Sequence, residues 1–589
     1  MEMLLRHVTM RDLAGMYARH SDRSPAPYLK DPKIVRRARR LAKKNGLWDQ
    51  LDQLDPEADI PAFKSSWFRR LRETKDRRLA AYYGRRTGPL DRAALAVWLG
   101  HPLGDIDYLQ DLIWTYCEDS TWVHGVHDAN DIDLSASAMG ASLAEIVHFL
   151  DDRLDTAVRD RIFAEVEKRI FQQFWNYRKP EWWKTVENNW NHVCNGSVIR
   201  AALYLIDDPD VLAHMTHAAI QNLTYALDGF ADDGGCGEGP AYWNYGFGHY
   251  LKVAEALHQR TGGELDIMAG DKIERICRYP LAAHIDGPFY SSFADSGHGE
   301  IPAWTALLIN SSYAIPELYE LCLLNQDRTL HLSNMFDLAL YGGEKGTGKP
   351  DPSDYELPDL GQAKLIGAPG ARQMTIMALA GDNGVSHNHN DIGSFIVYRA
   401  GKLLLVDPGA PMYTKQTFSP RRYEIIYCRS KGHSVPVIDG REQRNGSRYR
   451  GTLRTENLNG EGPKRAIIDM TQAYPRGTVG SLVRTLELDP KTNLLELCDK
   501  YAFKQKPKSI EEVFITFEKA TVSRDRKSVR IGTKTSGLEI RTIDAPGKFA
   551  IAVLEKESKE HQRTDDIITR ITFTPSNLAR EICLCFSIG

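Results

Sequence analysis

Positions 386–391 read Ser386-His387-Asn388-His389-Asn390-Asp391, a short polar stretch with two histidines two residues apart. In a regular strand, alternate side chains share one face, so an extended segment would place His387 and His389 side by side. A bend in the backbone would instead separate the two imidazoles. The apolar run at 392–398 predicts a buried strand directly after this polar stretch.

His387 and His389 are candidate metal ligands, and two more candidates follow along the chain. Asp407 ends the next apolar run, where a strand delivers its last side chain to a rim, and His433 comes after a further loop. Imidazole and carboxylate groups brought together by successive strand ends are typical ligands of divalent metal ions. On residue types alone, His387, His389, Asp407 and His433 therefore predict one metal cluster.

The composition bounds the class of protein. At 589 residues, the chain is too long for one ordinary core, so two or more domains are expected. With 26% charged residues and a net charge of -3, a nucleic-acid partner is not expected. An anionic substrate needs only a local basic cleft. No apolar run reaches the roughly 18 residues of a membrane span, so no membrane partner is expected.

The cysteines and the N-terminus indicate the compartment. The nine cysteines are scattered along the chain, which favours reduced and mostly buried thiols. The first residues contain no apolar core of signal-peptide length. A cytoplasmic protein is therefore expected, or a periplasmic or secreted one if an export signal has been removed. The oligomeric state is left open.

The spacing of apolar residues changes once along the chain. Between about 30 and 340 it has the helical period, which predicts paired helices in an arc or toroid. A glycine- and proline-rich stretch follows, and beyond it the period becomes two, with a hairpin over 483–503. We predict an α+β multidomain protein, with an N-terminal (α/α) toroid at 1–342, a linker at 343–361 and a C-terminal antiparallel β-sandwich at 362–589. The segments with the clearest helical spacing are 31–44, 93–99, 136–150, 157–174, 197–206, 212–227 and 248–257.

Two stretches of the helical region combine aromatic and polar residues. Positions 181–196 hold three tryptophans among four asparagines, and positions 232–246 hold a glycine-rich loop followed by Tyr242 and Tyr245 at helical spacing. Indole faces stack on sugar rings and amides bond hydroxyl or carboxylate groups, which favours a sugar-binding cleft. The alternative is structural: an asparagine-capped helix and tyrosines used in packing.

Together, five motifs resemble those of the heparinase II/III-like polysaccharide lyases. They occur in order at 188–196, 233–246, 387–395, 406–409 and 432–440. The resemblance implies an (α/α) toroid joined to a β-sandwich, with a substrate cleft between them. It also implies β-elimination at a uronic acid, in which a neutralised carboxylate, a base and an acid act together.

The resemblance assigns catalytic roles to four residues. Asn191 matches the amide that neutralises the carboxylate, with His192 as the neighbouring alternative. Tyr245 matches the catalytic tyrosine, with Tyr242 as the fallback. His387 matches the catalytic histidine.

The resemblance also divides the metal cluster predicted above. His389, Asp407 and His433 match the metal ligands, whereas His387 is left to face the substrate. This division requires the backbone to bend between His387 and His389. The metal is expected to be structural, with Zn²⁺ favoured by the ligand types and Mn²⁺ as the alternative.

The expected partner is an anionic polysaccharide, most simply a glycosaminoglycan. Asn188 to Asn191 lack the Asn-His-Gly pattern of typical alginate lyases, which makes alginate the second choice. A loop at 295–299 is expected to line the same cleft. The residues expected to contact substrate are Trp190, Glu238, Tyr242, Trp243, His127, Tyr413 and Arg422.

Two other functions remain open on the sequence alone. An inverting glycoside hydrolase would need two carboxylates about 6.5–9.5 Å apart, and Asp233 and Glu238 are the obvious pair. A non-catalytic carbohydrate-binding protein with a structural metal would cleave no polymer.

Overall fold

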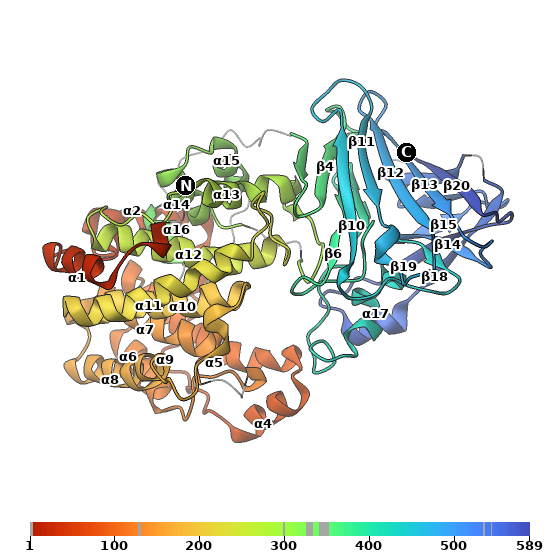
Figure 1. Cartoon of the computed structure of the whole chain (residues 1–589). Helices are drawn as coiled ribbons and strands as arrows, with labels where there is room; N and C mark the ends of the chain where they lie inside the picture. Colours follow the sequence, from red (N-terminus) through yellow and green to blue (C-terminus); the bar gives the residue numbers. More distant parts are fainter. Residues whose placement is uncertain are drawn as a thin grey trace. The chain divides into compact units, whose positions relative to one another are not determined.

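The computed structural model describes residues 4–127, 131–297, 301–324, 334–340, 353–533, 536–543 and 545–589 (Figure 1). The chain packs into two compact units, which are described separately. The helical unit comprises Met1–Gly229, Trp243–Glu274 and Ile301–Lys349. The β unit comprises Phe230–Tyr242, Arg275–Glu300 and Pro350–Gly589.

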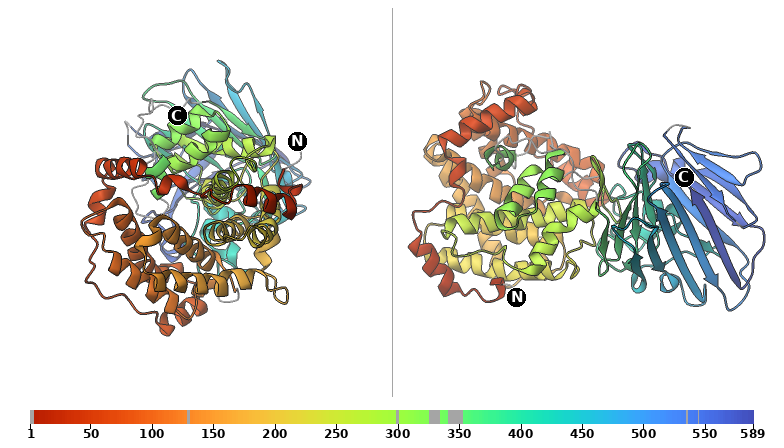
Figure 2. Two further views of the ribbon diagram at one scale, coloured as in Figure 1. Left: turned by 90° about the vertical axis from the view of Figure 1, so that its left-hand side faces the viewer. Right: turned by 90° about the horizontal axis from the view of Figure 1, so that it is seen from above.

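Helices make up most of the described chain before residue 341. Figure 2 shows them packed side by side, with α10 against α7 and α11, and α11 against α1. The predicted helical segments are confirmed, although most helices extend beyond the predicted ends. The helices are α1 (Met10–Arg19), α2 (Pro32–Asn45), α3 (Leu47–Leu51), α4 (Ser65–Thr74), α5 (Ala81–Leu99), α6 (Ile106–Glu118), α7 (Leu134–Leu150), α8 (Thr156–Val166), α9 (Gln172–Phe174), α10 (Asn189–Leu205), α11 (Pro209–Asp228), α12 (Pro240–Arg260), α13 (Asp271–Ala283), α14 (Ala303–Ser312), α15 (Pro316–Leu324) and α16 (Asn334–Leu340).

Local sequence explains where these helices begin. Asp31 accepts a hydrogen bond from the backbone N–H of Lys33 at the start of α2, and Asp208 caps α11 in the same way. Each of the two helices has proline at its first position, where the missing N–H is not needed. Within the described residues, no helix is both long enough and apolar enough to cross a membrane.

Antiparallel sheets form the β unit, as predicted. One sheet has nine strands in the order β15-β16-β17-β20-β13-β12-β11-β10-β6, a second has the order β3-β4-β5-β7-β8, and a third has the order β18-β19-β14-β9. The strands are β1 (His284–Asp286), β2 (Phe289–Tyr290), β3 (Tyr355–Leu357), β4 (Gln362–Ile366), β5 (Met374–Leu379), β6 (Gly381–Asn383), β7 (Phe395–Arg399), β8 (Lys402–Leu405), β9 (Val437–Ile438), β10 (Gly446–Glu456), β11 (Lys464–Asp469), β12 (Ser481–Asp489), β13 (Leu494–Ala502), β14 (Ile510–Thr516), β15 (Ala520–Val522), β16 (Ser528–Ile531), β17 (Leu538–Thr542), β18 (Gly547–Val553), β19 (Thr569–Pro575) and β20 (Glu581–Ile588); the short helix α17 spans Glu555–His561.

One hydrophobic core joins these sheets. Ile376 of β5, Leu486 of β12 and Phe573 of β19 belong to a single buried cluster. The predicted hairpin is confirmed as β12 and β13, which pair in register from Asp489 opposite Leu494. Alternate residues of β12 are buried, which is the pattern of a strand with one face on a core.

The division into units differs from the sequence order at two places. Residues 341–352, which include much of the predicted linker, lie outside the described residues. β3 lies within the remainder of that linker and pairs with β4, because Asp354 anchors it by accepting a hydrogen bond from the backbone N–H of Ile366. Two segments of the predicted helical domain, Phe230–Tyr242 and Arg275–Glu300, pack with the strands.

The expectation of reduced cysteines is wrong for one pair. Cys498 and Cys585 form a disulfide, although 87 positions separate them in the sequence. They meet because β13 pairs with β20 and places these two residues directly opposite each other. Among the free cysteines whose side chains the structure describes, all but Cys583 are buried.

A buried arginine ties the nine-stranded sheet to two loops that follow the candidate site residues. Arg484 of β12 is 1% exposed and donates to both carboxylate oxygens of Asp499, at 2.8 and 2.6 Å. Its other terminal nitrogen donates to the carbonyls of Gly393 and Ser434, at 2.8 and 2.6 Å. Glu512 lies 3.5 Å from the same guanidinium group.

Replacing this arginine should destabilise the β unit. In Arg484→Met, Asp499 stays buried without its counter-charge, and we expect a loss of about 3–5 kcal/mol in the free energy of unfolding. Urea denaturation followed by circular dichroism measures the loss. The matched control is Arg530→Met, since Arg530 forms a solvent-exposed ion pair worth about 1 kcal/mol or less. Equal stability of the two variants would contradict this account.

Candidate functional site

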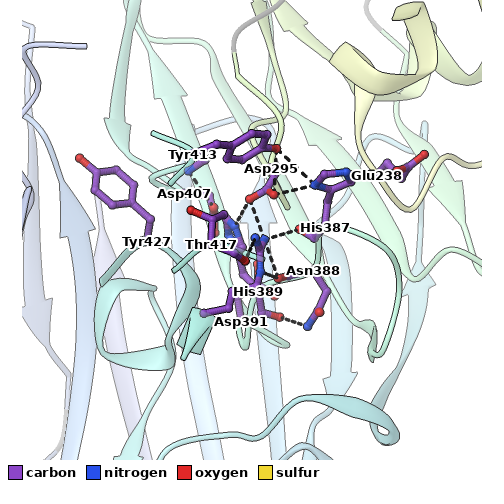
Figure 3. Close-up of polar contacts among 12 residues, drawn as sticks. Glu238, Asp295, His387, Asn388, His389, Asp391, Asp407, Tyr413, Thr417 and Tyr427 are labelled. Atoms are coloured by element: carbon purple, nitrogen blue, oxygen red, sulfur yellow. Dashed lines mark hydrogen bonds and ion pairs between the residues drawn. The ribbon is translucent and has the colours of Figure 1, made fainter. Parts of the chain in front are cut away.

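A single buried carboxylate, that of Asp295, lies at the centre of the candidate site (Figure 3). Its Oδ2 atom accepts hydrogen bonds from Nδ1 of His387 at 2.7 Å and from the hydroxyl of Tyr413 at 2.9 Å. Its Oδ1 atom accepts from Nε2 of His389 at 2.9 Å and from Nη2 of Arg422 at 2.7 Å. Asp295 thus orders four side chains at once.

The charge of Asp295 is stabilised by these donors. Burial by itself raises the pKa of a carboxyl group, but hydrogen bonds from His387 and His389 and the charge of Arg422 outweigh it. The net effect holds the pKa of Asp295 well below its ordinary value. The carboxylate is therefore a permanent acceptor.

The loop between β6 and β7 carries both histidines and is bent, as the division of their roles requires. His387 has a φ of 61°, in the left-handed region that non-glycine residues rarely adopt. Its carbonyl accepts from the backbone N–H of Asp295 at 3.2 Å, and Asn388 accepts from the hydroxyl of Tyr423 at 2.5 Å. The bend brings His387 and His389 to different oxygens of the same carboxylate.

His387 has the geometry of a general base. Because its Nδ1–H donates to Asp295, its Nε2 atom carries the lone pair that accepts a proton. Nε2 lies 3.6 Å from Oε1 of Glu238, which would stabilise a protonated imidazole. The ring of Tyr242 stacks on the imidazole with centroids 4.3 Å apart. The site therefore holds His387 from three sides.

Two tyrosines form a hydrogen-bonded chain that ends on Asp295. The hydroxyls of Tyr242 and Tyr413 are 2.6 Å apart, and Tyr413 donates onward to the carboxylate. Burial, followed by the negative charge of Asp295, raises the pKa of Tyr242. Tyr242 is therefore a protonated phenol that positions its neighbours.

A second cluster, formed by His389, Asp391, Asp407 and His433, could hold a metal ion. The four side chains are buried, and one ligand atom from each lies within 4.8 Å of the others. Nδ1 of His389 and Oδ2 of Asp391 have no hydrogen-bond partner among the described residues. Buried polar atoms are normally bonded, so two unsatisfied ones at the same place point to an absent ligand.

The hydrogen bonds around this cluster also fit a metal ion. Nε2–H of His389 donates to Asp295, and Nε2–H of His433 donates to the carbonyl of Tyr427 at 2.9 Å. Both Nδ1 atoms are thereby left to act as ligands, which is the usual arrangement of metal-bound histidines. Nδ1 of His433 lies 2.8 Å from Asp407. Burial alone would lower the pKa of His433, but Asp407 outweighs it and raises the pKa to about 9, so a proton holds the place that a cation would take.

The sequence predicted three of these four residues as ligands. Asp391 was absent from the predicted set, although it belongs to the same polar stretch as His389. Two imidazoles and two carboxylates suit Zn²⁺ or Mn²⁺. A bound ion would supply a fixed positive charge that joins the loop before β7 to the end of β8 and to His433.

Three residues predicted to act on substrate are enclosed in the helical unit. Trp243 is fully buried and its ring packs against Phe247, so its predicted contact with a sugar is wrong in this structure. His192 is 1% exposed, and burial lowers its pKa to about 3, which makes it a neutral core group. Asn191 is also buried, and its Nδ2 donates to the carbonyls of Lys184 and Asn222, each at 2.9 Å.

Other predicted residues of the helical unit reach its surface. Tyr245 is 40% exposed, one turn after Tyr242 on α12. Trp190 is half-buried, with its ring 4.8 Å from those of His127 and of the exposed Trp182. This aromatic group fits a surface that stacks on sugars, whereas both ring nitrogens of His127 are engaged by protein side chains.

Arg422 has a structural position instead of the predicted substrate contact. It is 8% exposed, and its nitrogens donate to Asp295 and to the carbonyls of His387, Asn388 and Thr417. Each of its three nitrogens therefore donates at least one hydrogen bond inside the protein. Asp295 itself was predicted only to lie in a loop near the cleft, because one aspartate in a short loop carries no signal of its central role.

The family that the motifs predict is confirmed for the C-terminal part of the chain. Residues 349–582 match the family described as heparinase II/III-like, C-terminal. No curated protein sequence matches the chain.

Solved structures show the same fold over most of the chain. It is similar to heparinase III, with a TM-score of 0.60 and 14% identity over 85% of this chain and 76% of that chain. It is also similar to heparan sulfate lyase HepC from Pedobacter heparinus, with a TM-score of 0.57 and 12% identity over 97% of this chain and 92% of that chain. The predicted fold class, helices followed by antiparallel sheets, is confirmed.

The metal cluster predicts a measurable ion content. We expect purified protein to contain about one divalent ion per chain by elemental analysis, and His433→Ala to lose most of it because one ligand is removed. The control is His258→Ala, an exposed histidine outside the cluster. Protein that binds no divalent ion, even when it is refolded with Zn²⁺ or Mn²⁺, would contradict the assignment.

Proposed function

We propose that this protein is a polysaccharide lyase that cleaves uronic-acid-containing polysaccharides by β-elimination. The observation that carries the proposal is the Asp295–His387 pair, which fixes one imidazole with an accepting Nε2 atom. His387 lies in the part of the chain that matches the heparinase II/III-like family, residues 349–582, and Asp295 precedes that part. Glycosaminoglycans are the first choice of substrate, since the similar solved structures include a heparan sulfate lyase; alginate is the second.

The proposed reaction needs three groups. A base removes the proton from C5 of the uronic acid, the electron pair of that C–H bond forms the C4=C5 double bond, and the C4–O4 bond breaks. The departing oxygen takes up a proton from an acid. Because the C5 proton is weakly acidic, the adjacent carboxylate must be neutralised by a donor before the proton can leave.

We assign these roles to residues on the following grounds. His387 is the base when the proton faces it, supported by its hydrogen bond to Asp295. Tyr245 is the catalytic tyrosine, because it matches the motif and its phenol is exposed, whereas Tyr242 is bonded to Tyr413. Asn191 remains the neutralising amide on its motif alone. Its bonds to backbone carbonyls must exchange before it can reach a carboxylate.

The geometry argues against the inverting hydrolase. Both carboxylate oxygens of Asp233 accept backbone N–H groups, from Gly235 at 2.9 Å and from Asp359 and Leu360 at 2.7 and 3.0 Å. Asp233 thus serves as a structural acceptor within the β unit. Asp233 is therefore unsuited to be the second carboxylate, beside Glu238, that an inverting mechanism requires.

A panel of polymers tests the proposal. Incubation with heparan sulfate, chondroitin sulfate, hyaluronan and alginate should give, for at least one polymer, an unsaturated product that absorbs in the ultraviolet. His387→Ala, Tyr245→Phe and Asn191→Ala should each lower the rate by about 10²-fold or more while circular dichroism stays unchanged. The matched control is Tyr225→Phe, an exposed tyrosine of α11. New reducing ends without ultraviolet absorbance would establish hydrolysis and contradict the proposal.

The central carboxylate makes a separate prediction. In Asp295→Asn, the side chain keeps its shape but loses the charge that selects the Nδ1–H form of His387. We expect the lyase rate to fall by about 10²-fold or more with the same product. Ser296→Ala, which alters the next residue, serves as the control. A rate within threefold of wild type for Asp295→Asn would remove Asp295 from the mechanism.

A further inference from the structure

A basic pocket lies in the β unit, at the loop between β9 and β10. Its volume is about 670 Å³. The pocket uses none of the four groups that bond to Asp295. It is lined by Asn390, Tyr423, Arg429, Arg441, Glu442, Gln443, Arg444, Asn445 and Pro475.

The charges in this pocket do not cancel. Glu442 is paired with Arg429, whose Nε donates to Oε2 at 3.0 Å. Arg441 and Arg444 are exposed, and neither has a carboxylate partner in the described part of the chain. Three guanidinium groups against one carboxylate leave two positive charges facing the pocket. Arginine binds carboxylate and sulfate groups well because its planar fork donates two parallel hydrogen bonds.

A second observation points to a ligand at the same place. Asn390 is 4% exposed and lines the pocket, yet its Oδ1 atom has no hydrogen-bond partner among the described residues. Its Nδ2 donates to the carbonyl of Gln443 at 3.4 Å, so only the amide oxygen is left unsatisfied. An unsatisfied buried acceptor is unfavourable unless a donor reaches it. A sugar hydroxyl is such a donor.

The pocket is held in shape before any ligand arrives. Gln443 is 3% exposed, its Nε2 donates to the carbonyl of Ile392 at 2.7 Å, and its Oε1 accepts from the backbone N–H of the same residue at 3.0 Å. Its own N–H donates to the hydroxyl of Ser430 at 3.1 Å. The loop that carries Arg441 and Arg444 is therefore fixed to the loop before β7. Less conformational freedom of this loop is lost when a ligand binds.

The pocket shares a wall with the loop that carries the base. Asn390 lies three positions after His387 in that loop. Tyr423 lines the pocket while its hydroxyl donates to Asn388 in the same loop. The pocket and His387 therefore belong to the same unit and are joined by one loop.

We propose that this pocket is an anionic-sugar subsite, in which Arg441 and Arg444 bind a sulfate or carboxylate group and Asn390 accepts a hydrogen bond from a hydroxyl. This inference rests on the proposed lyase function and extends it to a specificity site. The alternative is a solvated arginine surface with no ligand.

Binding to an inactive protein tests the subsite independently of catalysis. His387→Ala protein is titrated by calorimetry with heparan sulfate oligosaccharides, and then with the same oligosaccharides after desulfation or after reduction of their carboxyl groups. Adding Arg441→Ala and Arg444→Ala should raise the dissociation constant about tenfold or more, since the charged hydrogen bonds from both guanidinium groups are lost. The matched control, with the same change in charge, adds Arg524→Ala and Arg580→Ala, two exposed arginines of the β unit, and should change it less than twofold.

The chemically modified oligosaccharides identify the group that is bound. If the pocket takes sulfate, desulfation abolishes the difference between the pocket variant and the control; if it takes carboxylate, carboxyl reduction does so. Equal dissociation constants for the pocket and control variants would overturn the subsite. A wild-type protein that yields no unsaturated product, while the pocket variant still binds more weakly than the control, would overturn the lyase function and leave the subsite standing.

Discussion

The carboxylate of Asp295 is the constraint on which the candidate site depends. It accepts from His387 on one oxygen and from His389 on the other, so one side chain sets the tautomers of both histidines. The ring nitrogen that does not bond to Asp295 differs between the two histidines. His387 is left with Nε2 as its proton acceptor, whereas His389 is left with Nδ1 facing the buried cluster of Asp391, Asp407 and His433. The candidate metal ligand His389 and the proposed base His387 are thereby coupled through a single group.

Because of that coupling, a metal ion bound to the cluster would help to hold His387 in place. Ions bound by His389 would fix the ring that Asp295 must contact, and Asp295 in turn holds His387. The left-handed backbone of His387 is unfavourable for a residue with a Cβ atom, and such conformations persist only where surrounding contacts determine them. Arg422 supplies part of this restraint from one side, and Arg484 binds the carbonyls of Gly393 and Ser434 from the sheet. The two buried arginines thus help to fix the conformation of these loops.

Periodicity and motifs determined a large part of this protein from its sequence. The change from helical to strand spacing predicted helices followed by antiparallel sheets, and the β12–β13 hairpin lies where the turn residues indicate. These features depend on neighbours within about ten residues, which a sequence shows directly. The ordered motifs also predicted the family. They grouped His387, His389, Asp407 and His433 in one candidate site. A local pattern failed at Trp243, because an aromatic residue beside a glycine-rich loop is equally suited to a core.

Only the tertiary structure decided which residues meet. Asp295 and His387 are 92 positions apart, and Cys498 and Cys585 are 87 apart, so no local spacing relates them. In the sequence, Arg422 cannot be told from an arginine that binds substrate. Its burial against Asp295 appears only when the loops fold together. The sequence by itself determined the classes of element and the types of ligand, since those follow from periodicity and side-chain chemistry. The partners of each side chain were decided by strand pairing and loop packing, because hydrogen bonds and burial depend on groups that lie far apart in the chain.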